Sequence, residues 1–220
     1  MSDLPLDVTI SAGDCDLRAT LTVPARPVGL VIIAHPAWFC DHRAITRVLQ
    51  AHNVATLRVD LTGCCRIDPE LRVARLLAVT EWARRNSSVR ALPMAYLGVG
   101  DCATAALVAA RRLPGQIEAV VTAGERHDVL VRLLGGLAVP SLLIGEDAAG
   151  ALASKWQVAD RHLVITTPAV NGRGYTAAAL DTLARLADDW LTSHLQRATL
   201  EADRSRRNTM ARPSAYGDAA

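Results

Sequence analysis

An alternation of apolar runs and helix-like segments fills most of the chain after residue 28, and it limits the fold more than any other feature. The continuous apolar runs 29–34 and 94–99 are typical of strands that are covered on both faces. Helical periodicity follows each of them. Repeated strand–helix units predict an α/β fold: a mostly parallel sheet with helices on both faces.

The expected elements occur in a definite order. An antiparallel hairpin turns around Gly13 at the N-terminus, and the last helix is long and amphipathic. Strands are expected at 8–10, 17–23, 29–34, 54–59, 94–99, 117–122, 141–144 and 162–166. Helices are expected at 42–52, 69–85, 102–112, 127–134, 148–158 and 175–196. We therefore expect one domain over 1–197 and a polar, disordered tail over 198–220.

Composition excludes several classes of function. Half of the 220 residues are hydrophobic, which is enough for one substantial core, and the formal charge of +2 is nearly neutral. Arginines are spread along the chain and Lys155 is the only lysine, which argues against nucleic-acid binding. A signal peptide and a membrane-spanning run are both lacking, so we expect a cytoplasmic protein with no membrane partner. The five cysteines form no C-x-x-C pair, and neither a metal nor a cofactor is expected.

The loops that follow the strands are the expected place for a site, because parallel sheets bind ligands outside the carboxyl ends of their strands. Four of the five cysteines and three of the six histidines fall in these loops. Trp38 and Phe39 lie there too, where they would form an apolar wall for a ligand or anchor the loop. We therefore expect a small-molecule substrate or ligand, and a homodimer is left open.

Several segments resemble, in order, the small dienelactone-hydrolase-like proteins of the α/β-hydrolase superfamily. Ile33-Ala34-His35-Pro36 is similar to that group's strand ending in His-Gly, and 96–110 is similar to the strand and helix of its nucleophile elbow. Residues 163–171 resemble the last strand and the loop of the catalytic histidine, and 187–191 resemble the closing helix. The resemblance covers about residues 8–196 and implies an α/β-hydrolase fold without a large lid.

The same resemblance implies a degenerate catalytic triad. It places Gly100 at the nucleophile position and Asn171 at the position of the general base. The acid position falls on Asp147 if a short deletion is allowed, and on Ala149 if it is not. His35-Pro36 in place of His-Gly removes an N–H from the oxyanion loop. A serine hydrolase needs a nucleophile, a base and oxyanion donors, so we expect different chemistry here.

Two residues of the elbow turn have alternative interpretations. Cys102 could be the nucleophile of an elbow displaced by two residues, with its thiol pKa lowered by the helix N-terminus, or a small apolar residue that packs the helix on the sheet. Asp101 could cap the helix, which we favour, or point into a pocket as an acid or base.

Other residues of the loops that follow the strands complete the list of candidates. Cys40 could be a reactive thiol if a basic group adjoins it, and His127 is the best available general base, although an inert thiol and an exposed loop histidine are the alternatives we favour. His35 is expected to be structural, with its imidazole bonded to nearby backbone. The catalytic candidates are Asp101, Cys102, His127, Asp147 and Cys40, and the substrate-binding candidates are His35, Trp38, Phe39, Gly100 and Asn171.

Three functional hypotheses remain. The first, which we favour, is a small-molecule enzyme that acts on an apolar or aromatic substrate by non-serine acid–base chemistry such as cyclisation, isomerisation, elimination or decarboxylation. The second is a cysteine-dependent hydrolase of the dienelactone type that uses Cys102. The third is a non-catalytic binding or interaction protein built on a hydrolase scaffold.

Overall fold

The computed structural model describes residues 4–13, 15–36, 42–62, 68–126, 133–147, 155–159, 162–168 and 177–210. In these ranges the chain forms one nine-stranded sheet in the order β1-β2-β4-β3-β5-β6-β7-β9-β8. The strands are β1 (Leu6–Ser11), β2 (Asp16–Thr22), β3 (Gly29–His35), β4 (Val54–Asp60), β5 (Met94–Val99), β6 (Ala119–Arg126), β7 (Ser141–Asp147), β8 (Lys155–Ala159) and β9 (His162–Pro168). The helices are α1 (His42–Ala51), α2 (Pro69–Arg85), α3 (Cys102–Arg112) and α5 (Ala177–Met210).

The centre of the sheet is parallel and its edges are antiparallel. Strands β4, β3, β5, β6, β7 and β9 run in one direction. The hairpin β1–β2 pairs antiparallel with β4 at one edge, and β8 pairs antiparallel with β9 at the other. The mostly parallel sheet with an N-terminal antiparallel hairpin is therefore confirmed.

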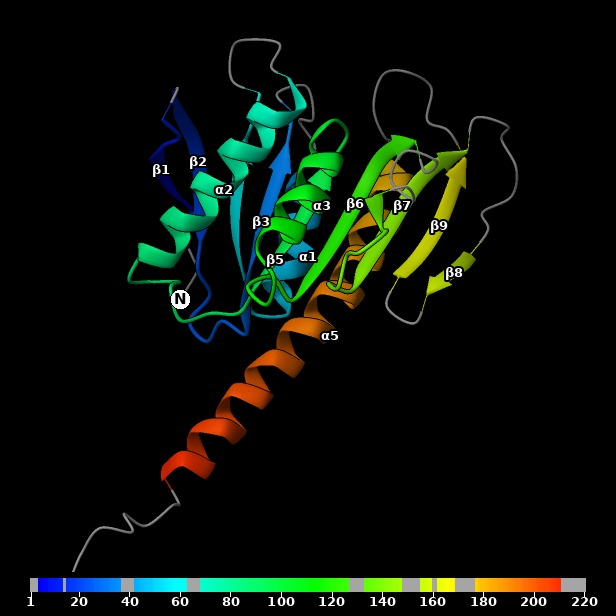
Figure 1. Ribbon diagram of the computed structural model, residues 1–220. Coiled ribbons are helices and arrows are strands. Elements are labelled where there is room, and N and C mark those ends of the chain that lie inside the picture. Colours follow the sequence, from blue (N-terminus) through cyan, green and yellow to red (C-terminus); the bar gives the residue numbers. More distant parts are fainter. Residues whose placement is uncertain are drawn as a thin grey trace, which may run out of the picture.

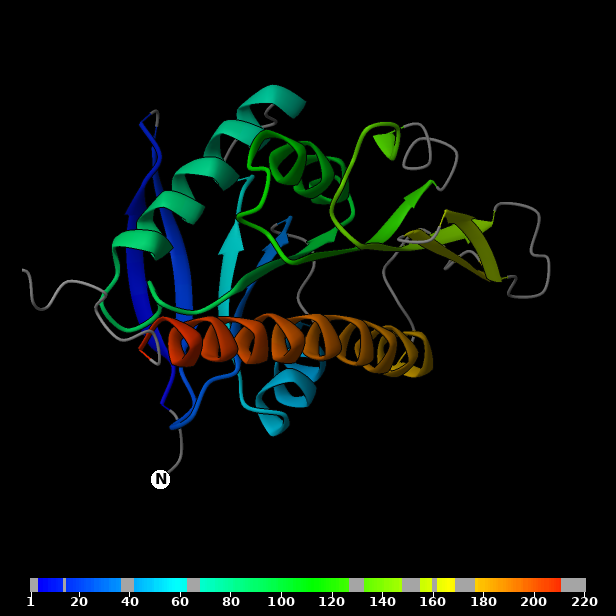
Figure 2. The same ribbon diagram turned by 60° about the horizontal axis from the view of Figure 1, so that its bottom comes forward.

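Helices cover both faces of the sheet, as the alternation predicted. Helices α2 and α3 lie on one face, and α1 and α5 lie on the other (Figures 1 and 2). Each layer encloses its own apolar cluster: Leu76 of α2 packs with Leu57 on the first face, and Leu183 of α5 packs with Leu97 on the second. No helix in the described ranges is long and apolar enough to cross a bilayer.

Two sequence-based boundaries were wrong. Residues 155–159 form strand β8 instead of the end of a helix, because their backbone pairs with 162–165 of β9 at the sheet edge. Helix α5 continues from the expected end near 196 to Met210, since no glycine or proline interrupts 177–210. Its last turns are solvent-exposed and project beyond the sheet (Figure 1).

Strand ends differ from the expectation at the rim where the site was predicted. β6 extends to Arg126 and β7 extends to Asp147, so residues assigned to loops continue the sheet. The expected helix at 127–134 falls mostly outside the described residues. The carboxyl ends of β3, β4 and β5 lie together at one edge, which is at the top of Figure 1.

Candidate functional site

The elbow turn lies where the sequence placed it, directly after β5. Strand β5 ends at Val99 and α3 begins at Cys102, so the turn is not displaced by two residues. Gly100 has a φ of +55°, in the left-handed region that favours glycine. Its N–H donates to the carbonyl of Ala123 at 2.7 Å, and its carbonyl accepts from the N–H of Ala103 at 2.9 Å. This residue occupies the sharp turn and contributes no side chain to it.

Gly98 allows the close approach of α3 to β5. A Cβ atom at this position would lie 2.7 Å from the carbonyl oxygen of Cys102 and 2.9 Å from both Ala103 Cα and Ala106 Cβ. Two of these neighbours are backbone atoms and cannot rotate away. The shape of the elbow therefore depends on a glycine here, independently of any reaction.

Cys102 is a packing residue. Its side chain is fully buried in the apolar cluster between the sheet and α3. Burial raises the pKa of the thiol to about 12; the Arg72 guanidinium opposes this rise, while the Asp101 and Asp60 carboxylates add to it. The expected lowering by the helix N-terminus is therefore wrong. A thiol that stays protonated and inaccessible cannot serve as the nucleophile.

Asp101 fits neither of its two interpretations. It has helical backbone angles at the cap position of α3, and its side chain makes no capping hydrogen bond. Its carboxylate is 58% exposed, and it accepts a hydrogen bond from Arg72 Nη2 at 3.3 Å. The capping prediction is wrong, and so is the prediction of a buried acid. Asp101 instead links the elbow to α2.

Arg72 is the residue that the sequence analysis missed at this turn. It comes from the start of α2, and its side chain is only 14% exposed although it carries a charge. Its Nε is buried and has no hydrogen-bond partner among the described residues. Only the placement of α2 beside α3 brings this guanidinium to the elbow, so no local pattern could have identified it.

His35 ends β3, and its ring is bonded as predicted. The ring Nδ1–H donates to the carbonyl of Pro36 at 3.1 Å. Burial lowers the pKa of the imidazole, against the opposing effects of that carbonyl and of Asp60, while Arg58 lowers it further. The predicted bond of the His35 ring to nearby backbone is thus confirmed, and the ring is neutral at pH 7.

Beside His35, a hollow of about 370 Å³ opens over β1, β2 and β4. Asp60, level with His35 in the sheet, lines it with Arg58. Asp60 Oδ1 accepts from the backbone N–H and the hydroxyl of Thr62, at 2.8 and 2.5 Å. Neither Arg58 nor Asp60 was predicted as a site residue, although each lies near the end of a predicted strand. These groups can bind and orient a polar ligand at the rim.

The remaining candidates cannot be placed in the same way. Asp147 is the last residue of β7 and is level with Pro168 of β9. The others lie outside the described residues: Trp38, Phe39, Cys40, His127, Ala149 and Asn171. Within the described ranges, no group of three or more His, Cys, Asp or Glu side chains is arranged to hold a metal ion.

Comparison with known proteins gives a sequence relative and a set of structural relatives. No family model matches the chain. A Mycobacterium tuberculosis protein named "Putative phosphoribosyl transferase" is 32% identical over 219 residues, which cover 88% of this chain and 48% of that protein. The chain thus spans about half the length of this relative.

Among solved structures, a dienelactone hydrolase from Anabaena variabilis is similar, with a TM-score of 0.73 and 25% identity over 88% of this chain and 99% of its own. A dienelactone hydrolase-like promiscuous phosphotriesterase from metagenomic libraries has a TM-score of 0.66 and 16% identity over 89% and 99%. The esterase Est1E from Butyrivibrio proteoclasticus has a TM-score of 0.60 and 17% identity over 92% and 100%. All three share the fold described above.

Proposed function

We propose that this chain, which has the α/β-hydrolase fold in its dienelactone-hydrolase-like form, is a small-molecule enzyme that acts without a serine nucleophile. Its substrate is apolar or aromatic and binds at the rim formed by the carboxyl ends of β3, β4 and β5. The reaction is a cyclisation, isomerisation, elimination or decarboxylation, in which the protein moves a proton and holds the substrate in place.

One observation carries the proposal. The sharp turn after β5 is intact, but its three residues offer no nucleophile: Gly100 has no side chain, Asp101 points to solvent and Cys102 is buried. Acyl transfer through the enzyme requires an activated nucleophile at this turn. The fold is kept while that requirement is not met, which supports a reaction of another class.

The neighbouring groups are suited to binding and proton transfer. His35 is neutral and held by the backbone, and Asp60 with Arg58 lines the adjoining hollow. In this proposal His127, Cys40 and Asp147 remain the candidates for the acid and base. Asp101 serves only to hold Arg72 at the turn.

A second candidate function is binding without catalysis. It is favoured by the chemistry of the turn itself, where the Cys102 thiol stays protonated and the Asp101 carboxylate is engaged by Arg72. The name of the mycobacterial relative describes a protein about twice as long, so its activity does not transfer directly to this chain. Ribose 5-phosphate nevertheless belongs among the ligands to be tested.

The test places a large side chain at the turn after β5, so that it blocks the proposed binding site. A Gly100→Phe variant places a large side chain where a ligand would meet the elbow, and Gly13→Phe is its matched control. Both glycines have positive φ, +55° and +88°, so a side chain at either position meets the penalty of left-handed backbone. A Cβ atom at Gly13, in the β1–β2 turn, meets nothing within 4 Å.

Native chain and both variants are incubated with a panel of aromatic acids, lactones and ribose 5-phosphate, and bound and free compounds are measured by equilibrium dialysis with mass spectrometry. We expect a compound that native chain and Gly13→Phe retain and convert to an isomer, or to a product lacking water or carbon dioxide, and that Gly100→Phe neither retains nor converts. Retention without conversion would support the binding function instead. Equal retention by Gly100→Phe would overturn the placement of the site.

A further inference from the structure

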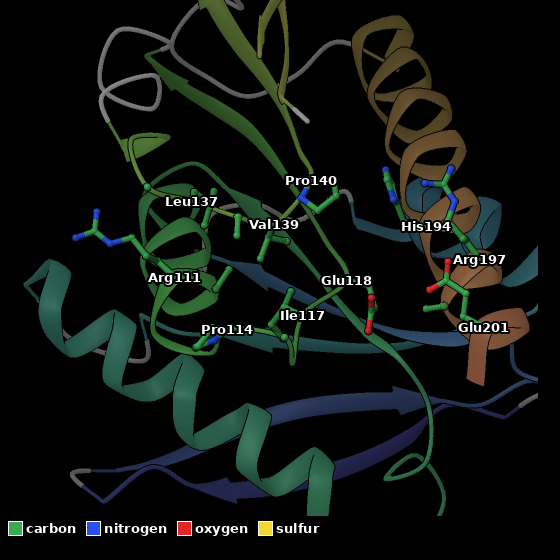
Figure 3. Close-up of a pocket in the computed structure, with 15 residues that line it drawn as sticks. Arg111, Pro114, Ile117, Glu118, Leu137, Val139, Pro140, His194, Arg197 and Glu201 are labelled. Atoms are coloured by element: carbon green, nitrogen blue, oxygen red, sulfur yellow. The ribbon is translucent and has the colours of Figure 1, made fainter. Parts of the chain in front are cut away.

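A second hollow lies at the opposite edge of the sheet from Gly100, and the proposed function does not use it. This basal pocket, of about 360 Å³, opens at the amino ends of β6 and β7, between the end of α3 and the middle of α5 (Figure 3). Its volume is within the range of small-molecule sites, roughly 300–1,000 Å³. It is therefore large enough for a compact organic ligand.

One wall of the basal pocket is apolar and fixed. Ile117, Leu137 and Val139 are each at least nine-tenths buried, and they belong to the core cluster beneath α3. Backbone hydrogen bonds fix the segments just before β6 and β7: the N–H of Glu118 donates to the carbonyl of Met94 at 2.8 Å, and the N–H of Val120 donates to the carbonyl of Pro140 at 2.9 Å. This wall offers an apolar ligand a preformed surface.

The opposite side of the basal pocket carries two carboxyl groups. Glu118 precedes β6, Glu201 comes from α5, and both line the hollow (Figure 3). Among the described residues, neither carboxyl group has a hydrogen-bond or ion-pair partner. Burial raises the pKa of Glu118, and the nearby Glu201 carboxylate raises it further. Two unpaired like charges at one pocket favour a cation between them.

Among the described residues, none of the other polar groups of the pocket forms an ion pair with these two carboxylates. Burial and the neighbouring Arg197 lower the pKa of His194, so its ring is neutral at pH 7. Arg197 and Arg111 also line the pocket, from α5 and from the end of α3. No group of three or more metal-ligating side chains occurs in the described ranges, and the apolar wall beside the carboxylates favours an organic cation.

We propose that the basal pocket binds a small organic cation: a protonated amine placed between Glu118 and Glu201, whose apolar body lies on Ile117, Leu137 and Val139. This site is separate from the rim at Gly100 and independent of the reaction there. Charge-assisted hydrogen bonds to the two carboxylates give recognition of the amine, and burial of the body adds affinity.

The probe is benzylammonium, with benzyl alcohol and benzoate as neutral and anionic analogues of the same shape, measured by isothermal titration calorimetry. Native chain is expected to bind benzylammonium saturably and the analogues at least tenfold more weakly. Glu118→Gln and Glu201→Gln are each expected to weaken benzylammonium binding about tenfold, as loss of one charged hydrogen bond implies. Glu81→Gln, on an exposed carboxylate of α2 that pairs with Arg85, is the matched control and is expected to bind as native.

Benzylammonium binding is expected to depend on the protonation of Glu118. The pKa of Glu118 is raised, so this side chain takes up a proton at a higher pH than an ordinary glutamate. The charged and titratable groups that line the pocket with it are Glu201, His194, Arg197 and Arg111. Benzylammonium affinity is therefore expected to fall as pH drops from 7 to 5, and Glu118→Gln is expected to reduce that dependence. Absence of saturable binding, unchanged binding by Glu118→Gln, or preference for benzoate would overturn the proposal. Gly100→Phe leaves the basal pocket intact, so a loss of binding in that variant would also contradict it.

Discussion

Gly98→Ala tests whether the elbow is held by a close approach of backbone to backbone. The added methyl carbon would lie at 2.7 Å from the Cys102 carbonyl oxygen, and at 2.9 Å from Ala103 Cα and Ala106 Cβ. Ordinary contacts of this kind begin near 3.4 Å, so α3 must move away from β5 by more than half an ångström. Overpacking of a rigid core typically costs about 1–3 kcal/mol, and backbone neighbours place this variant near 3.

The assay is urea denaturation followed by circular dichroism, with Gly13→Ala as the comparison. At Gly13 the methyl group meets nothing within 4 Å, and only the φ of +88° opposes it, at about 1–2 kcal/mol. Gly98→Ala is expected to lower the midpoint more than Gly13→Ala, with an unchanged slope. A Gly98→Ala protein within about 0.5 kcal/mol of native stability would refute the close-approach argument, since overpacking of this kind normally costs more.

Three further perturbations follow from single side chains. Asp188→Ala removes the α5 carboxylate that His52, the residue after α1, contacts at 2.7 Å. It is expected to lower the free energy of unfolding in urea by about 2 kcal/mol, whereas Ala at the exposed neighbour Asp189 is expected to be nearly neutral. The pKa of His35 is lowered in the folded chain, so the unfolded chain binds the proton more readily; the stability that this residue contributes is present above the unfolded pKa of about 6.5 and is lost as pH falls. His35→Gln is therefore expected to reduce the loss of unfolding free energy between pH 7.5 and 5. An unchanged pH dependence in that variant would show that the ring is solvated. Cys102, with a pKa of about 12, is expected to resist a thiol-reactive disulfide reagent at pH 8 in the folded chain and to react once urea unfolds it; labelling of Cys102 at equal rates in both states would show that the thiol is accessible.

Local patterns were sufficient where an element is defined by its own residues. The runs at β3 and β5 are apolar at every position because both faces of each strand are covered, and they were predicted almost to their ends. β8 was predicted as helix because its five residues become a strand only through pairing with β9 at the sheet edge. The final turns of α5 are mostly polar and solvent-exposed, and their few apolar residues form no stripe that would mark the continuation of the helix.

In the candidate site too, features defined by neighbouring residues were predicted, and features that depend on contacts between helices were not. The position of Gly100 followed from one contiguous stretch, and so did the backbone bond of His35. Asp101 was predicted to cap α3 because caps are local, but its partner is Arg72, 29 residues earlier on α2. Cys102 was predicted to have a pKa lowered by the helix N-terminus, whereas burial of its side chain between α3 and the sheet raises that pKa. Contacts between helices are not encoded in a window of neighbouring residues.

The absence of an activated serine is the central claim, and intact-mass spectrometry after treatment with a fluorophosphonate tests it most directly. The native chain at neutral pH is expected to keep its mass, because Gly100 occupies the turn where an activated nucleophile would be required. A stoichiometric adduct on a serine, formed by the folded chain and not by the urea-unfolded chain, would contradict the account.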